Sequence, residues 1–348
     1  MSPDAVVPLP YTREQVESLL GPNAESRLLD AYRWMVLGRT LDARFLALQR
    51  QGRVGFYGAA TGQEAVNVAA GLASTPADWV LPGLREQLVA LVRGHPLGAY
   101  VHHLFGDARD PALGRNMPCH PTAREVHYVS MSSVIGTQIS HAVGVAFGLR
   151  HAGERAVALA FFGDGATSSN DFHAGLNLAA VRGLPVLFAC TNNQWAISVP
   201  VRRQTAVPRL ATKANAYGLA GRTVDGTDVV ACWAETSRAL DRIRAGGPPE
   251  MLEFVLYRMT AHSSSDDPSR YQPSDWDAQA QARDPLARLD GWLGQHDLLD
   301  PPARERVRSE AEAQVRRAIV AAEGTAPPAP SSMTEDVLAA PRSGDTSP

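Results

Sequence analysis

The sequence predicts an α/β fold in which a parallel β-sheet is flanked by helices. Three short apolar segments, 156–162, 184–190 and 250–257, are separated by stretches whose apolar residues recur at helical spacing. Within these segments the apolar residues are continuous rather than alternating, as expected of strands that are covered on both faces. The order strand, helix, strand from 156 to 190 forms a βαβ unit, which favours parallel strands.

The first third of the chain is predicted to be mainly helical. Residues 1–25 are rich in proline and form an N-terminal extension, and 26–52 predicts an amphipathic helix that ends near Gly52. A glycine-rich loop then leads to a helix from Gln63 to Leu72. Further helical patterns follow at 84–94 and 96–105, and the stretch 106–128 is irregular.

The remaining elements fill the gaps between the predicted strands and the C-terminus. A small-residue loop precedes a helix that ends near Gly153, and Phe172, Leu176 and Ala179 lie on one face of the helix inside the βαβ unit. Another helix is predicted just before the third strand, at 229–245. After a loop at 261–273, two helices, about 275–296 and 301–323, lead to a Pro/Ser-rich tail at 326–348, so 26–325 is predicted to be the main domain.

Composition excludes several classes of protein. The net charge of -3 comes from 33 basic and 36 acidic side chains spread along 348 residues, which indicates neither a nucleic-acid nor a membrane partner. Three scattered cysteines form neither a disulfide framework nor a zinc motif, and no apolar run approaches membrane-spanning length. We therefore expect a soluble, untargeted, cytoplasmic protein. Lys213 is the one lysine, so a P-loop is also excluded.

Polar residues follow the first two predicted strands. Gly163, Asp164 and Gly165 come after one strand, and an Asn-Asn pair ending at Asn193 comes after the next, with 26 residues between Gly165 and the pair. The glycines allow a tight turn and close approach of a phosphate. Carboxylate, amide, carbonyl and phosphate oxygens together suit Mg²⁺. Each motif alone is typical of an ordinary turn, but two at neighbouring strand ends predict one shared site.

This pair of motifs resembles the thiamine diphosphate signature, and the chain from about Leu28 to Ala340 resembles the alpha subunit of the decarboxylating component of branched-chain 2-oxo acid dehydrogenases. The supporting stretches, in the family's order, are QRQGRVGFYG, GLREQ, RNMPCHPTAREVHYVSMSSVIGTQISHAVGVA, NNQWAIS, VDGTDV and YRMTAHSSSDDPSRYQ. The resemblance implies the diphosphate-binding half of a thiamine diphosphate-binding fold, with helical N- and C-terminal extensions.

The same resemblance implies roles for individual residues. It makes Asp164, Asn193 and the carbonyl of Trp195 the Mg²⁺ ligands, and the backbone N–H groups of Gly165 and Ala166 donors to the diphosphate. Two residues from other segments complete this set: Arg85 resembles a phosphate-contacting arginine, and His262 resembles the active-site histidine. In isolation Arg85 would be read as a surface ion-pair residue and His262 as an ordinary loop residue.

The stretch MSSVIGTQ resembles the loop that meets the cofactor's aminopyrimidine in branched-chain enzymes. By this resemblance Ser133 hydrogen-bonds the aminopyrimidine and Ile135 is the apolar wedge that favours the bent cofactor. A K⁺ ion would be held by the carbonyls of Ser132 and Val134 and the side chains of Thr137 and Gln138; an ordinary helix N-terminus is the alternative. Pyruvate-specific relatives carry a different, histidine-containing loop, so this stretch favours branched-chain substrates.

Some positions depart from the family pattern. Leu84 replaces a tyrosine beside the arginine, Thr191 replaces an arginine that some members have, and Ala261 replaces a histidine before His262. The resemblance also places Glu64 nearer the subunit contact than the cofactor. The serines at 263–265 match a loop that is phosphorylated in mitochondrial relatives; a merely mobile loop is the alternative.

The resemblance implies thiamine diphosphate-dependent oxidative decarboxylation of branched-chain 2-oxo acids, with acyl transfer to the lipoyl group of an acyltransferase. A separate beta subunit would supply the glutamate that activates the cofactor, in an α2β2 assembly, and the helix after Gln138 is a candidate packing surface. Two alternatives stay open: a pyruvate or acetoin dehydrogenase alpha subunit, and a catalytically degenerate regulatory or scaffold subunit.

Overall fold

The computed structural model describes residues 6–335 and confirms the predicted α/β class. Within these residues, five parallel strands form one sheet in the order β1-β2-β3-β7-β6. Their bounds are Trp79–Leu81 for β1, Ala158–Gly163 for β2, Val186–Asn192 for β3, Ala220–Asp225 for β6 and Glu250–Val255 for β7. The strand register pairs Gly163 with Thr191, so β2 and β3 end side by side.

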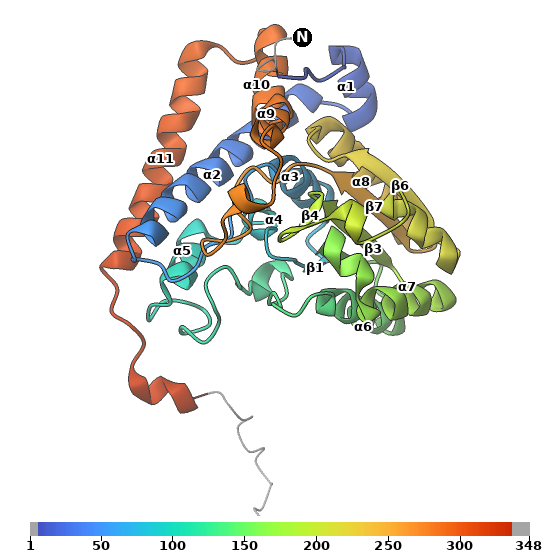
Figure 1. Ribbon diagram of the computed structural model, residues 1–348, viewed down its shortest axis with the longest axis horizontal. Coiled ribbons are helices and arrows are strands. Elements are labelled where there is room, and N and C mark those ends of the chain that lie inside the picture. Colours follow the sequence, from blue (N-terminus) through green and yellow to red (C-terminus); the bar gives the residue numbers. More distant parts are fainter. Residues whose placement is uncertain (1–5, 336–348) are drawn as a thin grey trace, which may run out of the picture.

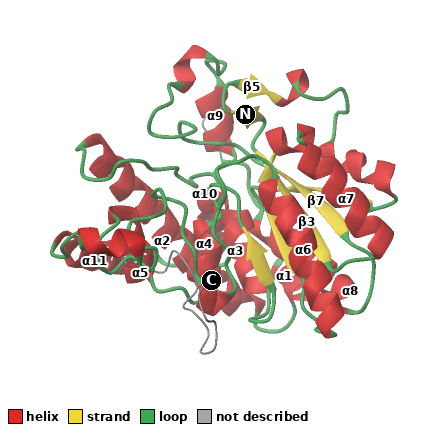
Figure 2. Ribbon diagram, turned by 90° about the horizontal axis from the view of Figure 1, so that it is seen from below, coloured by secondary structure: helices red, strands yellow, loops and turns green. Residues whose placement is uncertain are grey.

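Helices cover both faces of the sheet (Figures 1 and 2). Leu159, Phe161 and Leu187 belong to a core shared with α3 (Glu64–Ala73) and α8 (Val229–Arg244). The alternating residues Ala160, Phe162 and Phe188 belong to a second core, shared with α6 (Thr137–Ala152) and α7 (Asn170–Arg182). Because both sets are buried, β2 and residues 186–190 of β3 form continuous apolar runs, which is the pattern that predicted them.

Two strands of the sheet were not predicted. β1 is apolar but has only three residues, and β6 is an edge strand with mostly part-exposed residues and the polar sequence AGRTVD, so neither shows an apolar run of strand length. A separate two-stranded hairpin, β4 (Trp195–Ala196) and β5 (Val199–Pro200), follows β3. The three predicted strands and the βαβ unit are confirmed.

The predicted helices of the N-terminal third are confirmed, with small shifts of their ends. They are α2 (Ala24–Arg50), α3, α4 (Gln87–Val92) and α5 (Leu97–Phe105), and a short α1 (Arg13–Leu20) precedes them. Figure 1 shows α11 (Pro301–Glu323) running alongside α2. Short 3₁₀ helices occur at η1 (Arg124–Val126), η2 (Asp164–Ser168), η3 (Val201–Arg203), η4 (Leu210–Tyr217), η5 (Pro268–Arg270) and η6 (Pro330–Thr334).

The single helix predicted at 275–296 is two helices, α9 (Trp276–Ala282) and α10 (Pro285–Gln295). Pro285 disfavours helical conformation at Asp284, which stands before it. The Asp284 carboxylate instead accepts hydrogen bonds from the backbone N–H groups of Leu286 and Ala287 and begins a new helix. The prediction of one continuous helix was therefore wrong.

The predicted domain boundaries remain predictions. Residues 1–5 of the expected extension and 336–348 of the expected tail lie outside the described residues. Of the described tail, the carbonyls of Ser332 and Glu335 accept hydrogen bonds from Arg115. Over residues 6–335, no helix combines the length and the apolar character needed to cross a membrane.

We expect Phe188→Ala to destabilise the protein by about 3–5 kcal/mol, because the substitution opens a cavity where β3 packs against α6 and α7. Urea denaturation followed by circular dichroism measures this loss. Val320→Ala, on the exposed face of α11, is the control and should change stability by less than about 0.5 kcal/mol. Equal stabilities of the two variants would contradict the assignment of Phe188 to the core.

Candidate active site

A cleft of about 490 Å³ lies where β2 and β3 end. It is lined by every predicted site residue except Thr137: Arg85, Ser132, Ser133, Val134, Ile135, Gln138, Asp164, Gly165, Ala166, Asn193, Trp195 and His262. These residues come from segments far apart in the sequence. Thr137 is the first residue of α6 and its side chain is not part of the cleft wall.

Asp164 follows the last residue of β2 and is 1% exposed. Its carboxylate accepts a 2.9 Å hydrogen bond from the side-chain amide of Gln204. Burial raises the pKa of Asp164 to about 6, an effect opposed by the Gln204 hydrogen bond and by the positive charge of Arg258. A buried carboxylate with one neutral side-chain donor is a suitable ligand for a hard cation, because a cation would offset its desolvation.

Asn193 and Trp195 reach the same cleft from the end of β3. The side-chain oxygen of Asn193 accepts a hydrogen bond from the backbone N–H of Trp195 at 3.2 Å, and the Trp195 carbonyl accepts one from Arg258 at 3.4 Å. Asn192 points elsewhere, since its amide donates to Glu253 at 2.8 Å. No cluster of three or more His, Cys, Asp or Glu side chains suited to a metal is found in residues 6–335. A metal here would use one carboxylate together with amide and carbonyl oxygens.

Of the two glycines beside Asp164, Gly165 allows close packing against the hairpin that follows β3. Neither Gly163 nor Gly165 has a positive φ. A Cβ atom on Gly165 would lie 2.7 Å from the Cβ of Ala196, so a side chain does not fit there. The N–H groups of Gly165 and Ala166 lie in the first turn of η2, where N–H groups have no carbonyl partner within the helix.

Arg85 and His262 are in direct contact, although 177 residues separate them. Nη2 of Arg85 donates to the His262 carbonyl at 2.5 Å and lies 3.3 Å from Nδ1 of the ring, and Nη1 donates to the Ala59 carbonyl. A guanidinium can only donate, so Nδ1 accepts and the ring proton is on Nε2. No carboxylate pairs with Arg85 within 4 Å among the described residues.

The charges around this pair shift both pKa values. Burial and then the positive charges of Arg85 and Arg258 lower the pKa of His262 to about 4, against a smaller opposite effect of Asp266. Burial and the neighbouring Arg258 lower the pKa of Arg85 to about 10. At neutral pH the cleft therefore holds a neutral histidine beside a charged arginine.

The loop 131–136 forms an open rim of the cleft. Val134 and Ile135 are 68% and 65% exposed, although they line it. The Ser133 hydroxyl lies 2.5 Å from Nε2 of His120, whose Nδ1 is 3.0 Å from the Pro118 carbonyl. Since Nδ1 faces an acceptor, it carries the proton, so Nε2 accepts from Ser133.

Gln138 has a free acceptor at the inner end of this loop. Its amide nitrogen donates to the Phe161 carbonyl at 3.0 Å, and its buried side-chain oxygen has no hydrogen-bond partner in the described part of the chain. The Val134 carbonyl accepts a hydrogen bond from the Thr137 N–H at 3.4 Å. A free, buried amide oxygen fits a cation ligand, whereas Thr137 lies outside the cleft.

Sequence reasoning missed several residues of this site. Glu86 lines the cleft, and its carboxylate accepts from Gln63 and from the Arg85 N–H; burial raises its pKa. Because it directly follows Arg85 in the sequence, Glu86 could have been predicted to lie at the site. His120 and Arg258 lie inside the resembling stretches, whereas Gln204 stands in a loop with no pattern to mark it.

The departures from the family pattern have local structural roles. Leu84 packs against Gly58, where a Cβ would lie 3.2 Å from the leucine. The Thr191 hydroxyl donates to the Phe162 carbonyl at 3.3 Å and brings no charge to the cleft. Glu64 is buried inside the chain and pairs with Arg39 at 2.6 Å. Its expected place nearer a subunit contact than the cofactor stays a prediction.

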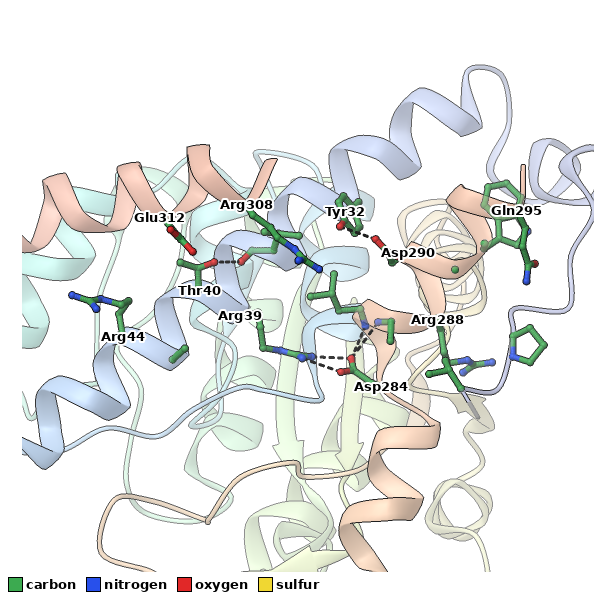
Figure 3. Close-up of a pocket in the computed structure, with 18 of the residues that line it drawn as sticks. Tyr32, Arg39, Thr40, Arg44, Asp284, Arg288, Asp290, Gln295, Arg308 and Glu312 are labelled. Carbon is green, nitrogen blue, oxygen red and sulfur yellow. Dashed lines mark hydrogen bonds and ion pairs between the residues drawn. The ribbon is translucent and has the colours of Figure 1, made fainter. Parts of the chain in front are cut away.

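A larger cavity of about 910 Å³ lies between α2, α10 and α11 (Figure 3). None of the predicted site residues lines it. Arg39 makes a bidentate ion pair with Asp284, both distances being 2.9 Å, and Tyr32 donates to Asp290 at 2.8 Å. Because none of the predicted site residues reaches this cavity, the smaller cleft is the better candidate for the active site.

Comparison with known proteins agrees with the family resemblance of the sequence motifs. The family model described as "Dehydrogenase E1 component" matches residues 32–331. The chain is 37% identical over 323 residues to the mitochondrial 2-oxoisovalerate dehydrogenase subunit alpha 2 of Arabidopsis thaliana, covering 92% of this chain and 68% of the relative. It covers 64% of a second Arabidopsis relative, subunit alpha 1.

Two bacterial proteins are similar over most of their length. The 3-methyl-2-oxobutanoate dehydrogenase subunit alpha of Mycobacterium tuberculosis (strain CDC 1551 / Oshkosh) is 41% identical over 288 residues, covering 83% of this chain and 76% of the relative. The pyruvate dehydrogenase E1 component subunit alpha of Staphylococcus aureus (strain Mu50) is 37% identical over 310 residues, covering 89% of this chain and 81% of the relative.

We expect His262 to titrate near pH 4 in the protein without added cofactor, as measured by NMR with the resonance assigned from His262→Gln. Arg85→Gln should raise this pKa, because it removes a positive charge beside the ring. Since the folded pKa lies below the unfolded value of about 6.5, the contribution to stability is complete above pH 6.5 and is lost as the pH falls toward 4.

Arg270→Gln is the matched control, because Arg270 is an exposed arginine of the same loop and should leave the His262 titration unchanged. A His262 pKa near 6.5 in the unsubstituted protein, or one that does not respond to Arg85→Gln, would show that burial and the Arg85 charge do not act on this ring.

Proposed function

Because the chain belongs to the dehydrogenase E1 component family, we propose that it is the alpha subunit of a branched-chain 2-oxo acid dehydrogenase. In this reaction a branched-chain 2-oxo acid loses CO₂, and its acyl group passes to the lipoyl group of an acyltransferase, whose disulfide is reduced. The observation that carries the proposal is the cleft that joins Asp164, Asn193, Arg85 and His262 at the ends of β2 and β3.

The residues of the cleft fit thiamine diphosphate with Mg²⁺. Asp164 and Asn193 supply side-chain oxygens, and Trp195 supplies a carbonyl, for an ion that prefers oxygen ligands. Gly165 and Ala166 offer backbone N–H groups from the first turn of η2 to phosphate oxygens. Arg85, a buried cation without a carboxylate partner, suits a phosphate oxygen.

The loop 131–138 fits the other end of the cofactor. The Ser133 hydroxyl donates a hydrogen bond to His120, so its oxygen is left to accept a hydrogen bond from an amino group. Ile135 is exposed at the rim, where it can act as an apolar support. The free oxygen of Gln138 supports a K⁺ site together with Ser132 and Val134; Thr137 contributes only if its side chain turns inward.

When bound, thiamine diphosphate would supply a nucleophilic carbon and an electron sink for the electron pair that stays on the substrate carbon when CO₂ leaves. The chain's own residues orient and shield that chemistry. His262 is neutral at physiological pH, with its Nε2–H free to donate to an oxygen of the substrate or of the lipoyl-bearing partner. The apolar side chains of Phe56, Leu84, Met117 and Ile197 line the cleft and exclude water around the reacting groups.

The rim of the cleft supports the need for a second chain. Met117, Val134, Ile135 and Ile197 are large apolar side chains that line the cleft and are exposed. Both carboxylate oxygens of Glu86 already accept hydrogen bonds within the chain, so it is poorly placed to activate the cofactor. A beta subunit that covers the rim and supplies a glutamate, in a cytoplasmic α2β2 enzyme, completes the proposal.

A pyruvate dehydrogenase alpha subunit is the second candidate, because the Staphylococcus aureus relative carries that name at 37% identity. The plant and mycobacterial relatives named for branched-chain substrates match at 37% and 41% identity. The MSSVIGTQ loop and the apolar lining favour branched-chain substrates.

We expect Asp164→Ala to abolish Mg²⁺-dependent binding of thiamine diphosphate, because it removes the one carboxylate of the proposed metal site. Isothermal titration of the chain assembled with its beta subunit measures the affinity. Asp241→Ala, an exposed aspartate on α8, should bind normally. Unchanged affinity in Asp164→Ala would refute the metal assignment.

For the substrate, we expect the assembled enzyme to show a higher kcat/KM for 3-methyl-2-oxobutanoate than for pyruvate, because an apolar lining favours a branched side chain. Steady-state turnover on the two acids under the same conditions measures the ratio. A preference for pyruvate would replace the branched-chain assignment with the second candidate.

A further inference from the structure

We propose that Asp42 is a positioning residue for this cleft: its carboxylate fixes the loop 56–62, and that loop fixes Arg85 and His262. The inference rests on the proposed function for its meaning, since Arg85 and His262 are proposed cofactor-site residues. Asp42 itself lies on α2 and does not line the cleft.

Three donors of the loop converge on the buried carboxylate of Asp42. The Tyr57 hydroxyl donates to Oδ1 at 2.8 Å, and the Ala60 N–H and Thr61 hydroxyl donate to Oδ2 at 2.8 and 2.7 Å. Hydrogen bonds to an ionised acceptor are stronger than neutral ones, and a buried donor left without a partner is costly. Among the described residues, the hydrogen bonds from the loop to α2 therefore all end on one side chain, beside the stacking of Tyr57 on Phe45.

The backbone of the same loop binds the residues of the cleft. The Ala59 carbonyl accepts from Nη1 of Arg85. Tyr57 makes two hydrogen bonds with Ser264: its carbonyl accepts from the Ser264 N–H at 3.2 Å, and its own N–H donates to the Ser264 hydroxyl at 3.4 Å. Ser264 stands two residues after His262, so the loop holds both members of the Arg85–His262 contact.

The loop has little room to shift. Gly62 has a φ of +97°, and a Cβ there would lie 2.2 Å from the Tyr257 carbonyl, so the loop backbone packs directly on the segment that leads to His262. The Gly62 N–H donates to Glu64 at 2.8 Å, and Glu64 pairs with Arg39. These contacts hold the C-terminal end of the loop. Loss of the hydrogen bonds to Asp42 therefore moves the Tyr57–Thr61 part, where Arg85 and Ser264 bind.

The first test measures the affinity for thiamine diphosphate with Mg²⁺ in the assembled enzyme. Asp42→Ala is expected to weaken binding by about tenfold or more, the equivalent of ~1.4 kcal/mol. Asp42→Asn keeps an acceptor for Ala60 and Thr61, and its amide can donate to the Tyr57 oxygen, so it is expected to stay within about threefold of the unsubstituted enzyme.

Asp78→Ala is the matched control for a merely structural effect. Asp78 is also a buried carboxylate that accepts backbone and side-chain hydrogen bonds, from the Val157 N–H at 2.8 Å and from Arg244 at 2.7 Å. It precedes β1, at the amino-terminal end of the strands, whereas the cleft lies at their carboxyl ends. The folded fraction of the Asp78→Ala variant should bind the cofactor with normal affinity. Equal losses of affinity in Asp42→Ala and Asp78→Ala would overturn the proposal.

A double substitution tests the path through Arg85. If Asp42 acts by placing Arg85, then Asp42→Ala should cost much less affinity in an Arg85→Gln background than in the unsubstituted enzyme. The same loss in both backgrounds would overturn the path. Thr61→Val, which removes one donor and keeps the shape, is expected to cause a smaller loss and serves if Asp42→Ala does not fold. A folded Asp42→Ala with full affinity would contradict the role of Asp42. If Asp42→Ala does not fold, unchanged affinity in Thr61→Val would contradict it.

Hydrogen exchange of the full chain separates this inference from the proposed function. Asp42→Ala should raise exchange in 57–62 and 259–264, whereas Asp78→Ala should not. Unchanged exchange in both segments would overturn the inference even if the cofactor binds. Failure of the unsubstituted enzyme to bind thiamine diphosphate would refute the proposed function, while the exchange result would still decide whether Asp42 holds the loop.

Discussion

The parallel hydrogen bonds between β2 and β3 place Gly163 beside Thr191, so the loops after both strands leave the sheet at one edge. Everything in the cleft depends on this alignment. Asp164 begins the 3₁₀ turn after one strand, and Asn193 and Trp195 begin the hairpin after the other. Helices on both faces bury the strands and prevent a slip in register, since a shift by one residue would exchange the side chains of the two cores. The site is thus set by the sheet, and its loops supply the chemistry.

The cleft keeps buried charges that do not pair with one another. Asp164 has a raised pKa, Arg85 has a lowered one, and His262 is held neutral by burial and by the two nearby arginines. Each of these groups is desolvated at a free-energy cost. In the proposed complex, a divalent cation offsets the cost at Asp164 and an anionic diphosphate offsets it at Arg85. A neutral donor such as Gln204 beside the Asp164 carboxylate suits this arrangement, because a cationic side chain bonded there would compete with the metal.

The sequence predicted what is local and repetitive. Continuous apolar runs identify β2, β3 and β7, and helical spacing identifies α2, α3, α6 and α8. It did not predict β6, whose polar residues are paired at a sheet edge, nor the break at Asp284 and Pro285, which depends on a capping side chain. The shared edge for Asp164 and Asn193 followed from strand order alone. The Arg85–His262 and Ser133–His120 contacts come from tertiary packing, and spacing along the chain carries no trace of them.

The contact between Arg85 and His262 joins positions 177 residues apart, and it bears on how the chain matures during synthesis. The ribosome releases the glycine-rich loop and Arg85 long before it releases the segment after β7. Until that segment emerges, the Ala59 carbonyl and Arg85 lack the histidine loop that closes over them. Truncated chains that end before β7 should be recognised by cellular quality control as incomplete, because they lack both the central strand that β6 pairs with and the residues that close the cleft.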